Sequence, residues 1–255
     1  MIYDILYVFY IVTSMYYNTC WVINMNWIKK NKEELLHHNM AFIGGITGIY
    51  AITVRGGNFG GAQTSNLIEL VFDFVSQDLF GFFVRILVLL VYAVSLVAAY
   101  LISTRFPGYK KYICLIVESV CGLLAGLIPA EVNPLLALCP IFTLSAFQWQ
   151  IFTESKHYNS STLFSTNNLK QMLLSWTNYT MHGDSEQKRK AFFFMRTLLT
   201  FHIGVVAGLF AVKFWNEKGI WFALLPMASA LYIYLLMEVK NQNSIILENQ
   251  SENCN

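Results

Sequence analysis

The stretch from Ala41 to Leu70 sets the strongest limit on what this chain can fold into, because it places a glycine-rich break between two apolar segments. Seven of the fifteen glycines lie between Gly44 and Gly61. A helical pattern restarts at Thr64-Ser-Asn, a sequence suited to a helix N-terminus. A bilayer tolerates irregular backbone only where it is buried in protein or lines a watery cavity. We therefore look for function first in this stretch.

The composition predicts an all-α integral membrane protein. Hydrophobic residues make up 56% of the 255-residue chain and charged residues only 13%, against about 25% charged in ordinary globular proteins. The formal net charge of +2 gives no reason to expect a nucleic-acid partner. The five cysteines are scattered and never spaced as Cys-x-x-Cys. We therefore expect no metal, no disulfide and no cofactor.

Hydropathy and turn residues predict about six transmembrane helices and two helices too short to cross a bilayer, which needs about 20 residues. The six spans are expected at residues 40–54, 82–104, 112–128, 134–152, 192–212 and 219–237. The first span is short, and Asn39 is its expected N-cap. The short helices are expected at residues 64–76 and 163–176, each after a polar or glycine-rich break.

The chain divides into four parts on this interpretation. Residues 1–24 form an apolar extension, for which three interpretations stand: an extra helix, an uncleaved signal-anchor, or a segment before a physiological start at Met25. The third is favoured by the lysine-rich run that follows Met25. Residues 25–130 form a first repeat of the membrane domain, 131–238 a second repeat, and 239–255 a disordered cytoplasmic tail.

The distribution of lysine and arginine predicts the orientation of the spans. With residue 25 inside, twelve Lys and Arg fall in the inner loops and ends, and four fall on the outer side. Inner loops carry such an excess in membrane proteins. We therefore expect a multi-pass protein of the plasma membrane with both ends in the cytoplasm.

Three short motifs recur in the same order in the two halves. Thr64-Ser-Asn-Leu-Ile-Glu-Leu matches Thr166-Asn-Asn-Leu-Lys-Gln-Met, Phe82-Phe-Val-Arg matches Phe193-Phe-Met-Arg, and Ala41-Phe loosely matches Ala146-Phe. Three spans in each half put the halves in opposite orientations, because three is an odd number. The prediction is two inverted repeats of three helices, each with a short broken or re-entrant helix, an arrangement found in many transporters and some channels.

The candidate site follows from this geometry, since inversion aims the starts of the two short helices toward each other. The N-terminus of such a helix offers free N–H groups and partial positive charge. The proposed substrate-binding residues are Thr64, Asn66, Thr166, Asn168, Glu118 and Gln148. The proposed helix-break glycines are Gly44, Gly45, Gly56, Gly57, Gly60 and Gly61. The competing interpretations are that the polar residues only cap interfacial helices and that the glycines only let helices pack closely.

Glu118 is an ionisable residue inside the expected third span, and such residues are functional candidates by default. Three interpretations stand for it: proton coupling, an ion pair with Arg196 or His202, or a neutral carboxylic acid bonded to a backbone carbonyl. Gln148 either lines a polar path or bonds between helices.

The residues that carry these motifs also resemble a known family. The segments His38-Asn-Met-Ala-Phe-Ile-Gly-Gly-Ile-Thr-Gly, Gly-Gly-Ala-Gln-Thr-Ser-Asn, Ala146-Phe-Gln-Trp-Gln and Phe164-Ser-Thr-Asn-Asn-Leu are similar to those of the YoaK-like bacterial transmembrane family. The resemblance covers residues 25–237. In that family the first break usually ends Thr-Gly-Asn, whereas this chain has Ser65 in place of the glycine. The resemblance implies a plasma-membrane protein and no defined reaction.

The function predicted from the sequence is a secondary transporter or channel for an unidentified small solute, with the lipid bilayer as its other partner. The alternatives are a membrane-embedded enzyme that acts on lipid and a non-catalytic scaffold. No Gly-x-Ser-x-Gly, His-Glu-x-x-His or Walker motif is present. A paired-aspartate intramembrane hydrolase needs two intramembrane aspartates, and only Asp73 comes close to the membrane. We therefore expect no enzymatic activity.

Overall fold

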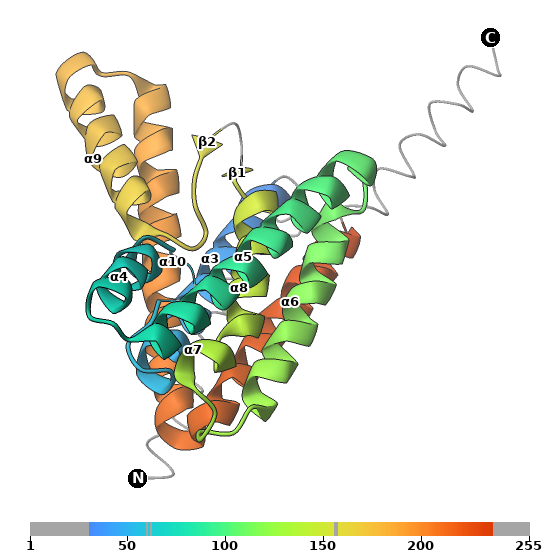
Figure 1. The fold of residues 1–255 in the computed structure, drawn as a ribbon. Helices are drawn as coiled ribbons and strands as arrows, with labels where there is room; N and C mark the ends of the chain where they lie inside the picture. The colour runs from blue at the N-terminus through green and yellow to red at the C-terminus, as the bar shows by residue number, and fades with distance from the viewer. Residues whose placement is uncertain (1–30, 60, 62, 156–157, 237–255) are drawn as a thin grey trace.

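A computed structural model of the chain describes residues 31–236, except for residues 60, 62, 156 and 157. The expectations for residues 1–24 and 239–255 lie outside the described residues. The elements run, in order, α3 (Lys32–Val54), α4 (Gln63–Val75), α5 (Leu79–Arg105), α6 (Lys110–Leu127), α7 (Pro134–Ala137), α8 (Cys139–Ile151), β1 (Glu154–Ser155), β2 (Tyr158–Asn159), α9 (Ser165–His182), α10 (Ser185–Trp215) and the 3-10 helix η1 (Asn216–Ala223) (Figure 1). Residues 224–236 continue as α-helix.

Among the described residues, two helical segments are long and apolar enough to cross a membrane: Leu79–Arg105, which is α5, and Ser185–Leu236, which contains α10 and turns at Asn216. Side chains on α5 that a soluble protein would bury are exposed, such as Phe83 at 62% and Val94 at 67%. Lipid is the medium in which such a surface is stable. The structure thus agrees with a helical protein that has candidate membrane spans.

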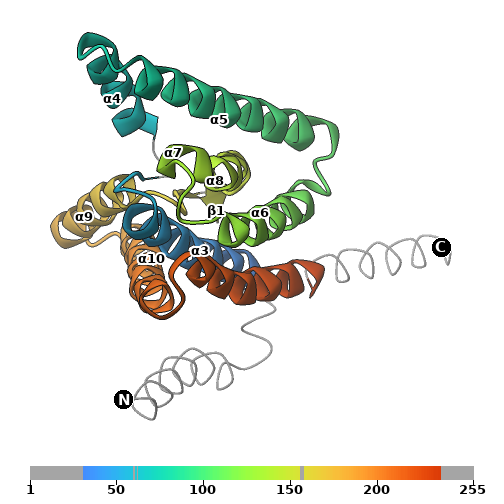
Figure 2. The same cartoon turned by 60° about the horizontal axis from the view of Figure 1, so that its bottom comes forward.

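The helices are arranged in layers. α5 lies on one side, α3 and α10 lie on the other, and α7 and α8 lie between them (Figure 2). α3 packs against α10, and α8 packs against α5. α6 contacts both α8 and η1. Each short helix lies beside the long helix that follows it in the chain, α4 against α5 and α9 against α10.

Glycines let α3 and α10 approach closely. A Cβ added at Gly45 would lie 2.1 Å from the carbonyl oxygen of Phe201, and one added at Gly204 would lie 2.1 Å from the carbonyl oxygen of Phe42. At Gly208 an added Cβ would lie 2.9 Å from the Cα of Ile46. Small residues have this role where two helix backbones meet in membrane proteins.

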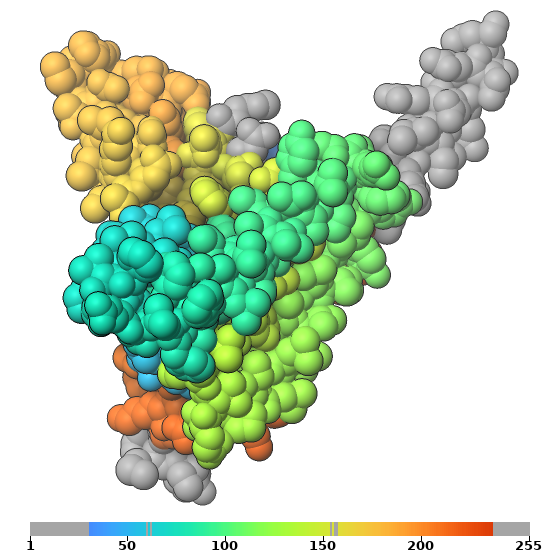
Figure 3. Space-filling view, in the orientation of Figure 1, coloured from blue at the N-terminus to red at the C-terminus, as the bar shows by residue number. Residues whose placement is uncertain are grey.

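α9 and the first half of α10 form a helical hairpin that projects from the rest of the molecule (Figure 3). Gly183 makes its turn with a positive φ of 70°, a conformation that costs glycine no steric strain. Asp184 then caps α10, because its side chain accepts a hydrogen bond from the Glu186 N–H at 2.8 Å. The short antiparallel strands β1 and β2 lie before α9, with Ser155 opposite Tyr158.

Most predicted helices form where the apolar runs and turn residues placed them. The expected fourth span, residues 134–152, is however divided into α7 and the 13-residue α8, and the second short helix, expected at residues 163–176, is the 18-residue α9. Two local predictions about α3 were also wrong. α3 begins at Lys32, so Asn39 is not an N-cap. The Asn39 side-chain amide instead donates to the carbonyl oxygen of Pro226 and to the Ser229 hydroxyl, both in the last described helix, residues 224–236. Gly44 and Gly45 do not break a helix either, because α3 continues through both of them to Val54.

Candidate functional site

The two irregular segments meet through aromatic side chains that are half-buried. The first break covers residues 55–62 and the second covers residues 152–164. The rings of Phe59, in the first break, and Phe164, in the second, are edge to face with centroids 6.5 Å apart. A Cβ added at Gly61 would lie within 3.5 Å of both rings. The Trp149 ring on α8 lies 5.7 Å from Phe164.

α3 provides the surface on which both breaks rest. A Cβ added at Gly48 would lie 2.8 Å from the Phe59 ring. One turn earlier, a Cβ at Gly44 would lie 2.2 Å from the backbone oxygen of Thr162. These two glycines therefore serve close contact with the breaks, whereas the positive φ values of Gly56 (70°) and Gly57 (83°) belong to the turn after α3. Gly60 lies outside the described residues.

Buried hydrogen bonds fix the second break against α3 and α8. The Gln148 side-chain amide donates to the carbonyl oxygen of Met40 at 2.8 Å and to the Thr162 hydroxyl at 3.0 Å. His37 Nε2 lies 3.0 Å from the Ser160 hydroxyl. Below, the junction means the region where the two breaks meet α3 and α8, formed by His37, Gly44, Gly48, Phe59, Gln148, Ser160, Thr162, Phe164 and Asn168.

Two buried polar atoms at the junction have no hydrogen-bond partner among the described residues: Gln148 Oε1 and His37 Nδ1. Gln148 is fully buried and His37 is 2% exposed. Leaving such an atom unpaired costs about 1–3 kcal/mol. The His37 side chain bonds Ser160 and the Gln148 side chain bonds Thr162. The two side chains with unpaired atoms therefore hold the same short piece of the second break, residues 160–162.

The two short helices bury corresponding positions. α4 buries Asn66 and Asp73, and α9 buries Asn168 and Ser175, so each pair is two turns apart. Over all 13 residues of α4 and over residues 165–177 of α9, buried, half-buried and exposed positions follow one another in the same order. Their first residues, Gln63 and Ser165, each carry a buried polar atom that has no partner among the described residues.

The predicted asparagines differ in their surroundings. The Asn168 amide oxygen accepts from the Ser160 hydroxyl at 3.1 Å and from the Ser161 N–H at 3.2 Å. Its amide nitrogen donates to the carbonyl oxygens of Ser161 at 2.6 Å and Phe164 at 3.2 Å. Asn168 thus holds the second break in shape. Asn66 donates to the Gln63 side chain at 3.3 Å.

The predicted threonines lie on another face of their helices from the asparagines. Thr64 and Thr166 are exposed, while Asn66 and Asn168 are buried. Thr64 lines an apolar groove of about 420 Å³ on α4. The structure therefore places the asparagines, and not the threonines, on the buried sides of the short helices.

Glu118 is fully buried in α6. The Cys114 thiol donates to its Oε1 at 3.2 Å, and its Oε2 has no hydrogen-bond partner in the described part of the chain. The two partners considered for it from the sequence bond elsewhere: Arg196 pairs with Glu34 at 3.1 Å, and His202 Nδ1 lies 2.7 Å from the Leu198 oxygen. Its carboxyl group therefore lies among helices rather than in an ion pair with either residue.

Two arginine contacts were not predicted from the sequence. Arg85 on α5 binds both carboxylates of α4, Glu69 at 2.5 Å and Asp73 at 2.6 Å, and so holds α4 in place. Arg55 is only 1% exposed. Its guanidinium group donates to the carbonyl oxygens of Ile128 at 2.7 Å and Pro129 at 3.0 Å, directly after the end of α6. The only sequence signal for the first contact was the spacing of Glu69 and Asp73, one helical turn apart.

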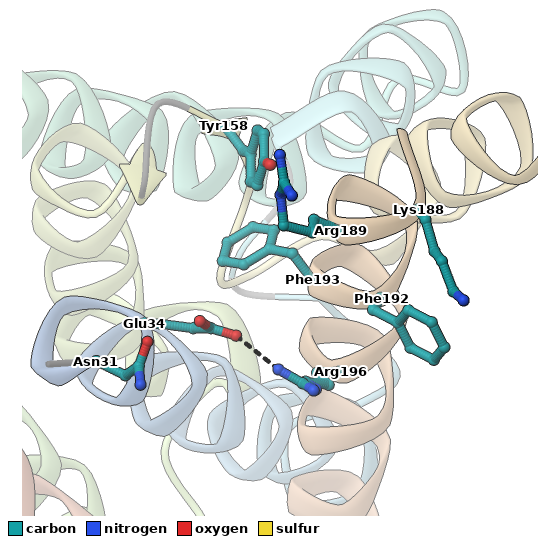
Figure 4. Close-up of a pocket in the computed structure, with 8 residues that line it drawn as sticks. All are labelled: Asn31, Glu34, Tyr158, Lys188, Arg189, Phe192, Phe193 and Arg196. Carbon is teal, nitrogen blue, oxygen red and sulfur yellow. Dashed lines mark hydrogen bonds and ion pairs between the residues drawn. The ribbon is translucent and has the colours of Figure 1, made fainter. Parts of the chain in front are cut away.

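A cavity of about 550 Å³ lies beside the junction (Figure 4). It is lined by Asn31, Glu34, Tyr158, Lys188, Arg189, Phe192, Phe193 and Arg196, and below it is called the charged pocket. The Phe193 ring connects it to the junction, because its centroid lies 5.1 Å from that of Tyr158 and 5.4 Å from that of His37. Burial and a hydrogen bond to the Glu186 carboxylate raise the pKa of Tyr158 to about 12.

The fold and the site define a class first: a helical protein with candidate membrane spans in which two broken segments meet between the helices. Within that class, residues 36–233 match the family described as "Protein of unknown function (DUF1275)", and the chain belongs to that family. The YoaK-like resemblance is consistent with this membership. No curated protein and no solved structure matches the chain.

Proposed function

We propose that the chain is a six-span protein of the plasma membrane that moves a small solute across the bilayer at the junction, as a carrier or a channel. Both ends lie in the cytoplasm, and residues 25–130 and 131–238 are inverted repeats. The observation that carries the proposal is the meeting of the two breaks against α3, through Phe59 and Phe164. Interrupted helices that meet between two repeats form the binding sites of many transporters.

The pattern of helix packing supports the repeat. The helix that carries the Ala-Phe motif in each half packs against the long helix of the other half, α3 against α10 and α8 against α5. The matching burial of α4 and α9 adds to this, since equivalent positions of two repeats are expected to face equivalent surroundings. Two interlocked inverted repeats are expected to pack in this way, with a helix of each repeat against the long helix of the other.

Gln148 and His37 are the residues that we expect to meet the solute. Each has one polar atom engaged with the second break and another that has no partner among the described residues. Asn168 acts as a positioning residue, because its side chain bonds the second break itself. The charged pocket is the entrance on the cytoplasmic side, from which Phe193 leads to His37.

Cysteine accessibility tests the proposal without knowledge of the solute. In a variant with the five native cysteines replaced by alanine, single cysteines are introduced at Asn58, Ser161 and Gln148. A membrane-impermeant thiol reagent should reach Asn58→Cys from outside the cell and Ser161→Cys from inside. A small charged thiol reagent should reach Gln148→Cys from the aqueous phase, although the side chain is fully buried in this structure.

The matched control is Leu144→Cys, one turn earlier on α8 and equally buried. It should stay unlabelled, because it belongs to the hydrophobic core. Labelling of Asn58→Cys and Ser161→Cys from the same side would exclude inverted repeats. Equal protection of Gln148→Cys and Leu144→Cys in all conditions would exclude an aqueous path through the junction.

A further inference from the structure

The arginines at matching places in the two halves have different surroundings. Arg85 and Arg196 end the matching motifs Phe-Phe-Val-Arg and Phe-Phe-Met-Arg. Arg85 binds two carboxylates, and its side chain is only 13% exposed. Arg196 binds Glu34 at 3.1 Å through one nitrogen, and its side chain stays 53% exposed at the wall of the charged pocket.

The carboxylates that neutralise Arg85 have no acidic counterparts in the second half. With the alignment in which Asn66 matches Asn168, Glu69 corresponds to Gln171 and Asp73 to Ser175. The guanidinium of Arg196 therefore pairs with one carboxylate, Glu34, and borders a cavity, whereas that of Arg85 pairs with two carboxylates of α4.

The charged pocket carries more positive than negative charge on its walls. Lys188, Arg189 and Arg196 line it, against the Glu34 carboxylate, while the Glu186 carboxylate is bonded to two lining residues, Tyr158 and Arg189. Figure 4 shows Arg189 beside Tyr158, and Arg196 reaching toward Glu34, while the Lys188 amine points away from these groups. Lys188 instead lies over the Tyr179 ring, 5.2 Å from its centroid. The two arginines are therefore the groups suited to a ligand.

Both arginines keep binding capacity. Arg189 is 67% exposed and pairs with Glu186, a residue of its own helix. Guanidinium groups bind phosphate and carboxylate through two parallel N–H bonds. The cavity of about 550 Å³ is within the usual size range of ligand sites, about 300–1,000 Å³. Phe192 and Phe193 add apolar surface beside the charged groups.

We propose that the charged pocket binds a phosphate-bearing anion through Arg189 and Arg196. This proposal rests on the proposed function in one respect, because the comparison of Arg85 with Arg196 treats the two halves as repeats. The phosphate belongs either to the headgroup of an anionic lipid or to a soluble solute on its way to the junction. Basic pockets between helices at the cytoplasmic side of membranes bind acidic headgroups, and a soluble anion would define the class of the transported solute.

Binding to the purified full chain in detergent tests this directly, without any measurement of transport. Isothermal titration calorimetry is carried out with three probes: soluble short-chain phosphatidylglycerol, short-chain phosphatidylcholine and inorganic phosphate. Phosphatidylglycerol that binds while phosphate and phosphatidylcholine do not identifies a lipid site. Inorganic phosphate that binds as tightly as phosphatidylglycerol identifies a soluble anion. In both cases added sodium chloride should weaken binding.

Three variants locate the site. Arg189→Gln removes an exposed side chain and should weaken binding about fivefold. Arg196→Lys keeps a positive charge beside Glu34, so the fold is retained, and should weaken binding similarly because the planar fork is lost. Lys170→Gln removes an exposed charge from α9 that does not line the pocket, and should leave binding unchanged.

The inference is overturned if none of the anionic probes binds, or if Lys170→Gln weakens binding as much as the two arginine variants. Its failure differs from failure of the proposed function. Cysteine accessibility at Asn58, Ser161 and Gln148 reports the junction and the repeats whatever the pocket binds. Anion binding in detergent reports the pocket whether or not a solute crosses the membrane.

Discussion

The contact between α3 and α10 leads to a quantitative prediction for two glycines. Gly45→Ala places a Cβ 2.1 Å from the carbonyl oxygen of Phe201 and 2.8 Å from the backbone nitrogen of Val205. Because Cβ atoms essentially never come within 3.0 Å of other heavy atoms, the two helix backbones must separate by most of an ångström. Overpacking of this kind costs about 1–3 kcal/mol. Alanine gains up to about 1 kcal/mol over glycine in helix propensity, so a net loss of up to about 2 kcal/mol is expected.

Gly204→Ala makes the reciprocal contact, since its Cβ would lie 2.1 Å from the carbonyl oxygen of Phe42. Either alanine pushes the same two backbones apart, so the second should cost less than the first. The double variant should therefore be destabilised by less than the sum of the single variants, as expected for residues that share a contact.

Thermal unfolding of the purified protein in detergent, followed by tryptophan fluorescence, measures these effects. Gly108→Ala is the matched control, because a Cβ there would meet no atom within 4 Å and its φ is not in the left-handed region. The unfolding temperature of Gly45→Ala should fall well below that of Gly108→Ala. If the two variants unfold at the same temperature, or if the double variant is fully additive, the close packing of α3 and α10 is refuted.

Four other substitutions separate support of the fold from function. Asn168→Leu should lower stability by about 2–3 kcal/mol, because the Ser160 hydroxyl and the Ser161 N–H lose their acceptor. Asn66→Leu should cost less than about 1 kcal/mol. Equal losses of stability in thermal unfolding would contradict these roles. Arg85→Gln should speed hydrogen exchange throughout α4 and leave α9 unchanged, because it removes the ion pairs between α4 and α5. Glu118→Gln should change only the pH dependence of thiol labelling at the junction, and a pH profile like that of the parent would exclude a role for the Glu118 proton.

The helices could be predicted from the sequence because their signals are local. Pro129 and Asn133-Pro134 stop one helix and start the next, and the Asn133 side chain accepts from the N–H groups of Leu135 and Leu136. The glycine-rich run likewise marks the end of α3. Such signals depend on neighbours in the chain, so one sequence is enough to find them.

The contacts that form the junction could not be predicted in the same way, since they join residues far apart in the sequence. His37 and Ser160 are 123 positions apart, and Gln148 and Met40 are 108 apart. Asn39 shows the resulting error: its residue type and position are typical of a cap, yet its partners lie 187 and 190 positions away. Gly44 and Gly45 were misjudged for the same reason, because only the structure shows the backbones that they face.

The two halves of the chain do not contribute equally to the junction, and under the proposed function this bears on how a solute would be held there. Both breaks rest on α3, at Gly44 and Gly48. When Ala146 is aligned with Ala41, Trp149 corresponds to Gly44 and Thr153 to Gly48, so the second half has no glycine at either position. α8 also ends at Ile151, before the second of these positions. α8 instead contributes Gln148, which bonds the second break. A solute at the junction would therefore meet polar side chains from α3, α8 and the second break, and mainly the Phe59 ring from the first break. Its hydrogen-bonding groups should therefore face His37, Gln148 and the second break rather than the first break.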